Sequence, residues 1–193
     1  MSTSDTHELR RMLGAHAPVA AARALGDDPG RPVLVLRGDV PAGWSADGHA
    51  ERPLEAHRAA HAAGTPSQAA LVYGHGVTEE ALAERLAGLA ALAAETGLLR
   101  EVWTVPADGT PERPGSWGVE DLTVVATSRT ALPAEVAVLP SWHHLGHAAC
   151  QVAIAFGATG WRVPADEDRD LVHLAAGIGR AVREGGSGAE GPA

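Results

Sequence analysis

The sequence contains no lysine, no asparagine and only one cysteine among its 193 residues. Without lysine, the chain cannot form a lysine Schiff base or a phosphate-binding loop of the Walker type, and without asparagine it has no N-glycosylation site. The single cysteine, Cys150, excludes an internal disulfide, a zinc ribbon and an iron–sulfur cluster held by several thiolates. The apolar neighbours of Cys150 favour a buried structural thiol over a reactive one.

Basic side chains are also fewer than acidic ones: the chain has 15 arginines and 24 acidic side chains, which gives a net charge of -9. The acidic residues are spread along the chain, whereas nucleic-acid binding needs a concentrated basic face. We therefore expect no nucleic-acid partner. No apolar run reaches the length of a transmembrane helix, and residues 1–5 do not resemble a signal peptide. We expect no membrane association and a cytoplasmic location.

Aromatic residues make up only 4% of the chain, whereas alanine occurs 39 times. A core of small aliphatic side chains on closely spaced elements suits helices packed on a sheet. Short apolar runs alternate with helix-like segments along the chain. The predicted strands are 33–36, 69–73, 102–105, 135–139 and 161–163. The predicted helices of this alternation are 53–63, 79–95, 120–132, 144–156 and 168–183.

The alternation predicts parallel strands joined by right-handed crossovers, and therefore an α/β fold. We expect a partial (βα) barrel of about five parallel strands in sequential order with alternating helices, resembling half of a TIM barrel, over residues 31–184. Residues 1–30 are predicted to be an N-terminal helical segment with a helix over 7–25. The Gly- and Ser-rich residues 185–193 are predicted to be a disordered tail.

One group of candidate residues lies around the end of the predicted strand 69–73. Tyr73 ends the strand, His75 lies between two glycines that permit close approach of a ligand, and Thr78 caps the following helix, which Gly97 ends. At such a turn, a polar group of a ligand can meet free backbone N–H groups. A structural turn with an incidental histidine is the alternative interpretation.

The densest histidine group lies within residues 141–147. His143 and His147 are four residues apart and would share one face of a helix, as in zinc proteases, but His144 stands where that pattern needs a glutamate and no third ligand is indicated. Three interpretations stay open for this group: a metal site, the polar lining of a pocket at the strand ends, or a solvated helix start.

The carboxyl ends of parallel strands meet at one edge of a sheet, and α/β folds place their binding sites there. Residues expected to gather at this edge are Tyr73, His75, 103–106, Ser141, Trp142 and Arg162. Arg129, in the helix after the third predicted strand, is interpreted either as a partner for a ligand carboxylate or as a helix surface residue. The candidates for the pocket are Tyr73, His75, Thr78, Arg129, Trp142, His143 and His144.

Several segments together resemble the C-terminal half of radical S-adenosylmethionine (radical SAM) enzymes of the futalosine menaquinone pathway, in particular the aminodeoxyfutalosine synthases. Their order and spacing are kept over about residues 51–160. The matching segments are 58–64, 71–75, Thr78, 89–97, 118–122, 126–129, Trp142, 145–146, 149–153 and 156–158.

The resemblance implies a barrel of alternating strands and helices, but the chain departs from the family in three places. The Cys-x3-Cys-x2-Cys loop that binds the [4Fe–4S] cluster is absent, so the three thiolates needed for radical chemistry are missing. Val77 stands where the family has a carboxylate, which removes a polar group near the cofactor cleft. Residues 161–164 replace the Gly-Thr pair after the family's last strand.

These observations lead us to expect a degenerate radical SAM paralogue, a pseudoenzyme without radical catalysis and without a cofactor, acting as a binding or partner subunit. Strands 33–36 and 161–163 would leave open sheet edges, which favours a homodimer or a complex with a full-length radical SAM enzyme. The alternative is a small enzyme that uses His75 with His143, His144 and His147 on a small molecule at the strand ends. A remnant without retained function is the third interpretation.

Overall fold

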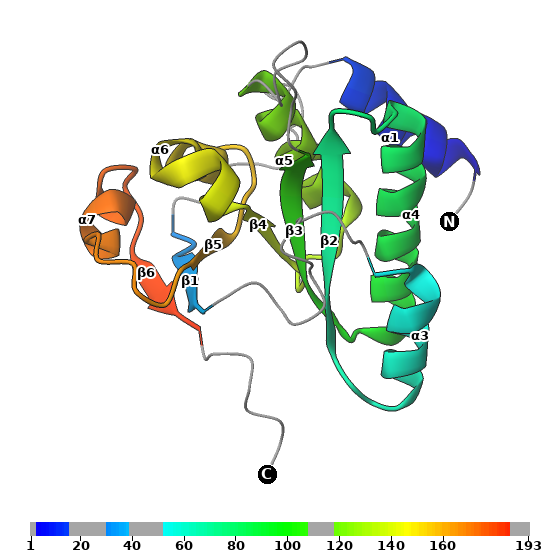
Figure 1. Cartoon of the computed structure of the whole chain (residues 1–193), viewed down its shortest axis with the longest axis horizontal. Coiled ribbons are helices and arrows are strands. Elements are labelled where there is room, and N and C mark those ends of the chain that lie inside the picture. Colours follow the sequence, from blue (N-terminus) through cyan, green and yellow to red (C-terminus); the bar gives the residue numbers. More distant parts are fainter. Residues whose placement is uncertain (1–2, 16–29, 39–51, 108–117, 186–193) are drawn as a thin grey trace.

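The computed structural model describes residues 3–15, 30–38, 52–107 and 118–185, in which parallel strands alternate with helices (Figure 1). The α/β class predicted from the sequence is therefore confirmed. In chain order the elements are α1 (Thr3–Gly14), β1 (Val33–Arg37), α3 (Leu54–Ala62), β2 (Ser67–Gly74), α4 (Glu79–Thr96), β3 (Leu99–Ala107), α5 (Val119–Ala131), β4 (Ala137–Pro140), α6 (Trp142–Ile154), β5 (Gly160–Val163), α7 (Leu171–Ala176) and β6 (Val182–Glu184).

The predicted half-barrel of five strands in sequential order is wrong, because the strands form two three-stranded parallel sheets. One sheet has the order β2-β3-β4 and the other β5-β1-β6. Strand β1 is the central strand of its sheet: Val35 lies opposite Trp161 of β5 on one side and Glu184 of β6 on the other. The open edge predicted at residues 33–36 is therefore not present.

Strand β6 was missed because its sequence carries little strand signal. Residues 182–184 read Val-Arg-Glu, and two of the three are charged, so the sequence predicts residues 182 and 183 to be the end of a helix over 168–183. The helix observed there, α7, spans only Leu171–Ala176, and Gly179 adopts a left-handed φ of 70° before the chain turns into β6. Pairing with β1 then supplies the hydrogen bonds that this short segment cannot form alone.

The two sheets meet where β4 lies beside β5. An isolated parallel bridge joins Ser141 to Arg162, and the backbone N–H of Thr159 donates to the Val138 carbonyl at 2.9 Å. The hydroxyl of Thr159 also accepts from the Val138 N–H at 2.9 Å. These contacts place the carboxyl ends of β4 and β5 next to each other.

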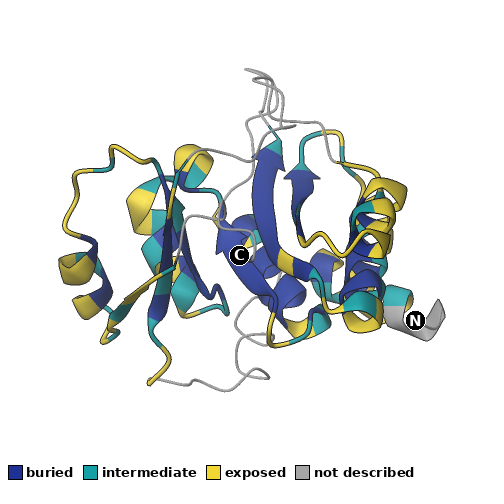
Figure 2. Cartoon of the chain, turned by 90° about the horizontal axis from the view of Figure 1, so that it is seen from below, coloured by how far each residue is buried: buried dark blue, intermediate teal, exposed yellow. Residues whose placement is uncertain are grey.

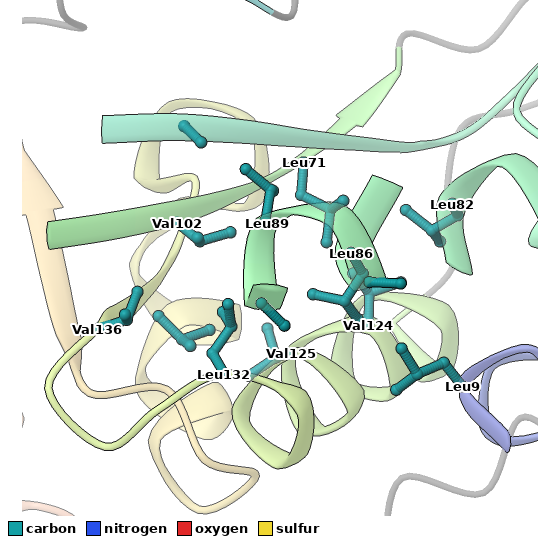
Figure 3. Packing of buried hydrophobic residues seen from close by; sticks show 14 of the residues in the cluster. Leu9, Leu71, Leu82, Leu86, Leu89, Val102, Val124, Val125, Leu132 and Val136 are labelled. Carbon is teal, nitrogen blue, oxygen red and sulfur yellow. The ribbon is translucent and has the colours of Figure 1, made fainter. Parts of the chain in front are cut away.

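Helices α4 and α5 cover one face of the β2-β3-β4 sheet, and α1 packs against these two helices. Leucines and valines fill the space between the elements (Figure 3). Leu71 and Val102 of the sheet are buried together with Leu86 and Leu89 of α4 and Val125 of α5. Figure 2 shows the buried residues concentrated on the strands and on the helix faces turned toward them. The predicted core of small aliphatic side chains is confirmed.

Strand β1 contributes to two apolar clusters on opposite faces of its sheet. Val33 and Val35 pack in a cluster with Trp161 and residues of α6 and α7. Leu36 points the other way and packs with residues of the β2-β3-β4 sheet, including Val72 and Leu139. The two sheets are therefore joined by buried side chains as well as by the contact between β4 and β5.

Several sequence predictions fall partly or wholly outside the described residues. The helix predicted over 7–25 corresponds to α1 as far as Gly14, and its remaining residues lie outside the described ranges, as do residues 186–193 of the predicted tail. Thr78 and Gly97 delimit α4 as predicted. Among the helices of the described ranges, none combines the length and apolar character that crossing a bilayer requires.

Candidate functional site

A pocket of about 120 Å³ lies at the carboxyl ends of the strands where the two sheets meet. Gly38 follows β1, Pro140 ends β4 and Val163 ends β5, so three strand ends contribute to it. Its lining residues are Gly38, Trp103, Pro140, Ser141, Trp142, His143, Arg162, Val163 and Pro164. Parallel α/β sheets place ligands at such a position, because the strand ends and the following loops converge there.

Arg162 places a guanidinium group in the wall of this pocket. Its Nη2 lies 2.6 Å from Oε2 of Glu101, and the two side chains are only 10% and 11% exposed. The guanidinium carbon lies 4.5 Å from the centre of the Trp103 ring, close enough for a cation–π contact. The Nε of Arg162 is buried and has no partner among the described residues.

Glu101, the ion-pair partner of Arg162, lies on β3 of the other sheet. Its Oε2 also accepts from the indole N–H of Trp103 at 2.8 Å, and its Oε1 accepts from Nε2 of Gln68 at 3.2 Å. Both carboxylate oxygens are therefore engaged, which compensates part of the cost of burying the charge. The arrangement fixes one positive group and one indole ring at the pocket.

Ser141 connects β4 to α6 at the rim of the pocket. Its backbone N–H donates to the Thr104 carbonyl at 3.1 Å, and its Oγ lies 2.7 Å from Nδ1 of His144. The ring of His143 stands edge-on to the ring of His144, with centroids 5.3 Å apart. A serine hydroxyl and an imidazole therefore lie in hydrogen-bond contact beside the pocket.

Trp142 forms another part of the pocket wall and is 6% exposed. Its indole N–H donates to Oε2 of Glu167 at 2.8 Å, and its ring lies 5.7 Å from that of Trp161. Burial opposes ionisation of Glu167, but hydrogen bonds from the Arg169 backbone and from Trp142 outweigh it and lower the pKa of the Glu167 carboxyl. An ionised Glu167 thus anchors the Trp142 ring.

The helix face predicted for His143 and His147 is interrupted. Gly146 lies between them with φ 74° and ψ 170°, so α6 is kinked there. His147 instead places its ring 6.5 Å from that of Trp142. Within the described ranges, no group of three or more His, Cys, Asp or Glu side chains is arranged to hold a metal ion.

Three predicted candidates at the end of β2 lie away from the pocket lining. Tyr73 is fully buried on the helix-covered face, where its O–H donates to Oδ1 of Asp121 at 2.6 Å. Thr78 is exposed and accepts from the Ala81 N–H as the cap of α4. His75 lies partly buried in the turn between them.

Arg129 closes the C-terminal end of α5 and does not reach the pocket. Its guanidinium donates to the carbonyls of Val136 at 2.7 Å and Leu132 at 2.6 Å, and also to that of Pro133. The side chain is buried, and three of its five N–H donors bind these carbonyls. Arg129 therefore connects the helix to the loop before β4.

Of the residues expected at the strand ends, the structure brings Trp103, Ser141, Trp142 and Arg162 together, with His143 beside them. The role of Glu101 was missed. Glu101 and Trp103 are two residues apart on one strand and so point to the same face, which is the signal that would have linked the carboxylate to Arg162.

Sequence reasoning also missed a buried polar network at the opposite end of β2. Ser67 Oγ lies 2.8 Å from Nδ1 of His57 and 2.7 Å from Nε2 of His61, two histidines one turn apart on α3. Nδ1 of His61 lies 2.8 Å from Oγ1 of Thr96 at the end of α4. The spacing of the two histidines on the predicted helix 53–63 was the available signal.

The hydrogen-bond directions in this network follow from its two ends. The Thr96 hydroxyl donates to the Leu92 carbonyl, so it must accept from Nδ1–H of His61. Neutral His61 then accepts at Nε2 from the hydroxyl of Ser67, which in turn accepts from Nδ1–H of His57. The relay ends at Nε2 of His57, which is buried without a partner among the described residues.

Burial lowers the pKa of His57 to about 4, and the positive charges of Arg85 and Arg52 act in the same direction. Burial also lowers the pKa of His61. Both rings are therefore neutral at pH 7, as the relay requires. This network binds α3 to β2 and α4, and it is a structural feature because its serine is only 6% exposed.

Cys150 is fully buried in the cluster between α6 and the β5-β1-β6 sheet, which confirms the predicted structural thiol. Burial, together with the negative charge of Asp121, raises the pKa of the thiol to about 12. The sulfur is therefore protonated at neutral pH and is a poor metal ligand or nucleophile.

No protein-family model and no curated protein matches this chain.

Proposed function

We propose that the protein is a degenerate relative of the radical SAM enzymes that it resembles, and that it binds a small molecule in the strand-end pocket without radical catalysis. The observation that supports binding is the pocket itself. Two indole rings, Trp103 and Trp142, and the buried cation Arg162 converge at the junction of the two sheets. Apolar walls with one fixed polar group are typical of small-molecule sites.

The absence of radical chemistry is supported by cysteine usage. A site-differentiated [4Fe–4S] cluster needs three thiolates from the protein, and this sequence contains one cysteine. That one, Cys150, is buried and protonated. Anaerobic reconstitution with iron and sulfide should therefore give no stoichiometric cluster absorbance.

Association is the second part of the proposal, with a second copy of the chain or with a complete radical SAM enzyme as partner. Strand β1, whose predicted open edge favoured association, does not support this part of the proposal, because β1 is paired on both sides. The resemblance supports it instead, because the chain is similar to the C-terminal half of a family whose complete barrel encloses every sheet edge. A cytoplasmic location belongs to the same proposal.

The structure reduces the number of histidines that can take part in the alternative function, a small enzyme that uses histidines at the strand ends. His75 lies beyond β2 and His147 beyond the kink at Gly146; of the four candidate histidines, His143 lines the pocket and His144 contacts its lining residue Ser141. A catalytic role therefore depends on the residues around Ser141.

Ligand-observed NMR with a library of single-ring fragments tests the binding proposal. We expect binding that is lost in Trp142→Ala and weakened at least about tenfold in Arg162→Met, because the first removes a pocket wall and the second removes the guanidinium of that wall. Val172→Ala, at an exposed residue of α7, is the control and should bind like the wild type. Fragments that bind all variants equally, or none that bind the wild type, would contradict the proposal.

A further inference from the structure

Ser141 and His144 form a serine–imidazole pair held by the fold. Oγ of Ser141 and Nδ1 of His144 are 2.7 Å apart. The serine backbone is fixed on both sides, by its N–H bond to the Thr104 carbonyl and by the bridge to Arg162. Such a distance is the geometry by which a histidine activates a serine nucleophile.

The hydroxyl of Ser141 is not used for capping. Serine at the residue before a helix commonly accepts a hydrogen bond from a backbone N–H of the first turn. Ser141 occupies that position before α6 but makes no side-chain cap bond. Its hydroxyl is paired with the imidazole instead, and it lies at the wall of the pocket.

A second, independent observation is the cation in the wall of the same pocket. Arg162 lines the pocket, its side chain is nine-tenths buried, and Glu101 fixes its guanidinium. A carbonyl oxygen that gains negative charge during a reaction is a suitable partner for this cation.

We propose that Ser141 is a nucleophile and His144 its general base, and that they hydrolyse a short acyl ester bound in the pocket between Trp103 and Trp142. This inference rests on the proposed function, because the ester is the ligand of that pocket. The volume of about 120 Å³ corresponds to about four water molecules. It therefore suits an acyl group of a few carbon atoms.

The chemistry balances with water as the only co-reactant. Oγ of Ser141 attacks the ester carbonyl carbon while Nδ1 of His144 takes the hydroxyl proton. The bond from that carbon to the alcohol oxygen breaks, and His144 returns the proton to the leaving alcohol. His144 then takes a proton from a water that attacks the acyl carbon, the bond from that carbon to Oγ breaks, and His144 returns the proton to Oγ, which leaves a carboxylic acid and free Ser141.

The test is reaction of the full chain with p-nitrophenyl acetate, followed by intact mass measurement and peptide mapping. We expect one acetyl group, located on Ser141, with release of one equivalent of p-nitrophenol before steady turnover. Ser141→Ala should lose this label. His144→Gln should slow its formation by about 10²-fold, the usual contribution of a general base, and abolish its pH dependence.

His173→Gln is the matched control, because that histidine is exposed on α7 and should leave the rate unchanged. An acetyl group on other residues only, or equal labelling of Ser141 in His144→Gln, would overturn the proposal. The wild-type map decides the location of the label even where a variant fails to fold. Fragment binding to Ser141→Ala tests the binding proposal separately from the nucleophile. If fragments still bind to this variant, the binding proposal is supported whether or not the wild type is acetylated on Ser141.

Discussion

His57 is a buried base whose ring carries no charge in the folded protein. It is fully buried, and its pKa of about 4 lies well below the value near 6.5 of an unfolded chain. The relay from Thr96 through His61 and Ser67 requires this neutral state, because His57 donates through one nitrogen only. Protonation of the unfolded chain therefore competes with folding.

Stability is expected to fall as the pH is lowered from about 6.5 toward 4. In that window the unfolded state binds a proton at residue 57 and the folded state does not, so the free energy of unfolding decreases with falling pH. The shift for His57 corresponds to about 3 kcal/mol, and His61 adds a loss of the same sign. Urea unfolding at several pH values measures it.

His57→Gln should remove most of this acid dependence, whereas His173→Gln, at an exposed residue of α7, should keep it. A wild-type free energy of unfolding that stays constant from pH 6.5 to 4.5 would contradict the neutral relay.

Strand β1 depends on a glycine in its neighbour. Gly160 of β5 lies opposite Leu34, and a Cβ at residue 160 would stand 2.0 Å from the Leu34 carbonyl oxygen. Real structures do not contain such a contact, so β5 and β1 would have to separate. Only glycine permits the spacing that makes β1 the central strand.

Gly160→Ala is therefore expected to destabilise the protein by about 3 kcal/mol, the upper part of the range for overpacking. Thermal and urea unfolding measure the loss. Gly177→Ala is the control, because Gly177 has a helical backbone with φ -61° and ψ -19°, and the nearest atom to a Cβ there is the flexible end of the Gln151 side chain at 3.2 Å. Equal stability of the two variants would show that β1 and β5 are not packed as described.

At the scale of the whole molecule, the pair formed by Glu101 and Arg162 links the two sheets. Glu101 belongs to β3 and Arg162 to β5, and both side chains are about nine-tenths buried. Removing one partner leaves a buried charge without compensation, which costs more than the net contribution of the intact pair.

Glu101→Gln is expected to lower the free energy of unfolding by about 3 kcal/mol. In the double variant with Arg162→Met, part of the loss should be regained, because no uncompensated cation remains. A double-mutant cycle in urea measures this coupling. Additive effects of the two substitutions would show that the ion pair does not connect the sheets.

The association part of the proposal makes a prediction for the whole chain. Sedimentation velocity at micromolar concentration should show a dimer, or a complex when a full-length radical SAM enzyme is added. A monomer throughout, with no complex, would contradict the association proposal.

Much of the local structure was determined by the sequence alone. The apolar run at 33–36 predicts β1, Thr78 and Gly97 delimit α4, and the neighbours of Cys150 predict its burial. Each of these signals acts between residues that are close in the chain, through hydrogen bonds or side-chain periodicity within one element. The strand ends also indicated that Trp103, Ser141, Trp142 and Arg162 would meet.

Only the tertiary structure decided which strands pair and which polar side chains meet. Val35 lies opposite Glu184 across 149 positions of sequence (184 minus 35), and no local pattern specifies that contact. The partners of Arg162 and His57, namely Glu101 and Ser67, likewise lie on other elements. Such pairings depend on the packing of the complete chain, because a buried charge or hydrogen-bonding atom is stable only beside a partner that folding brings to it.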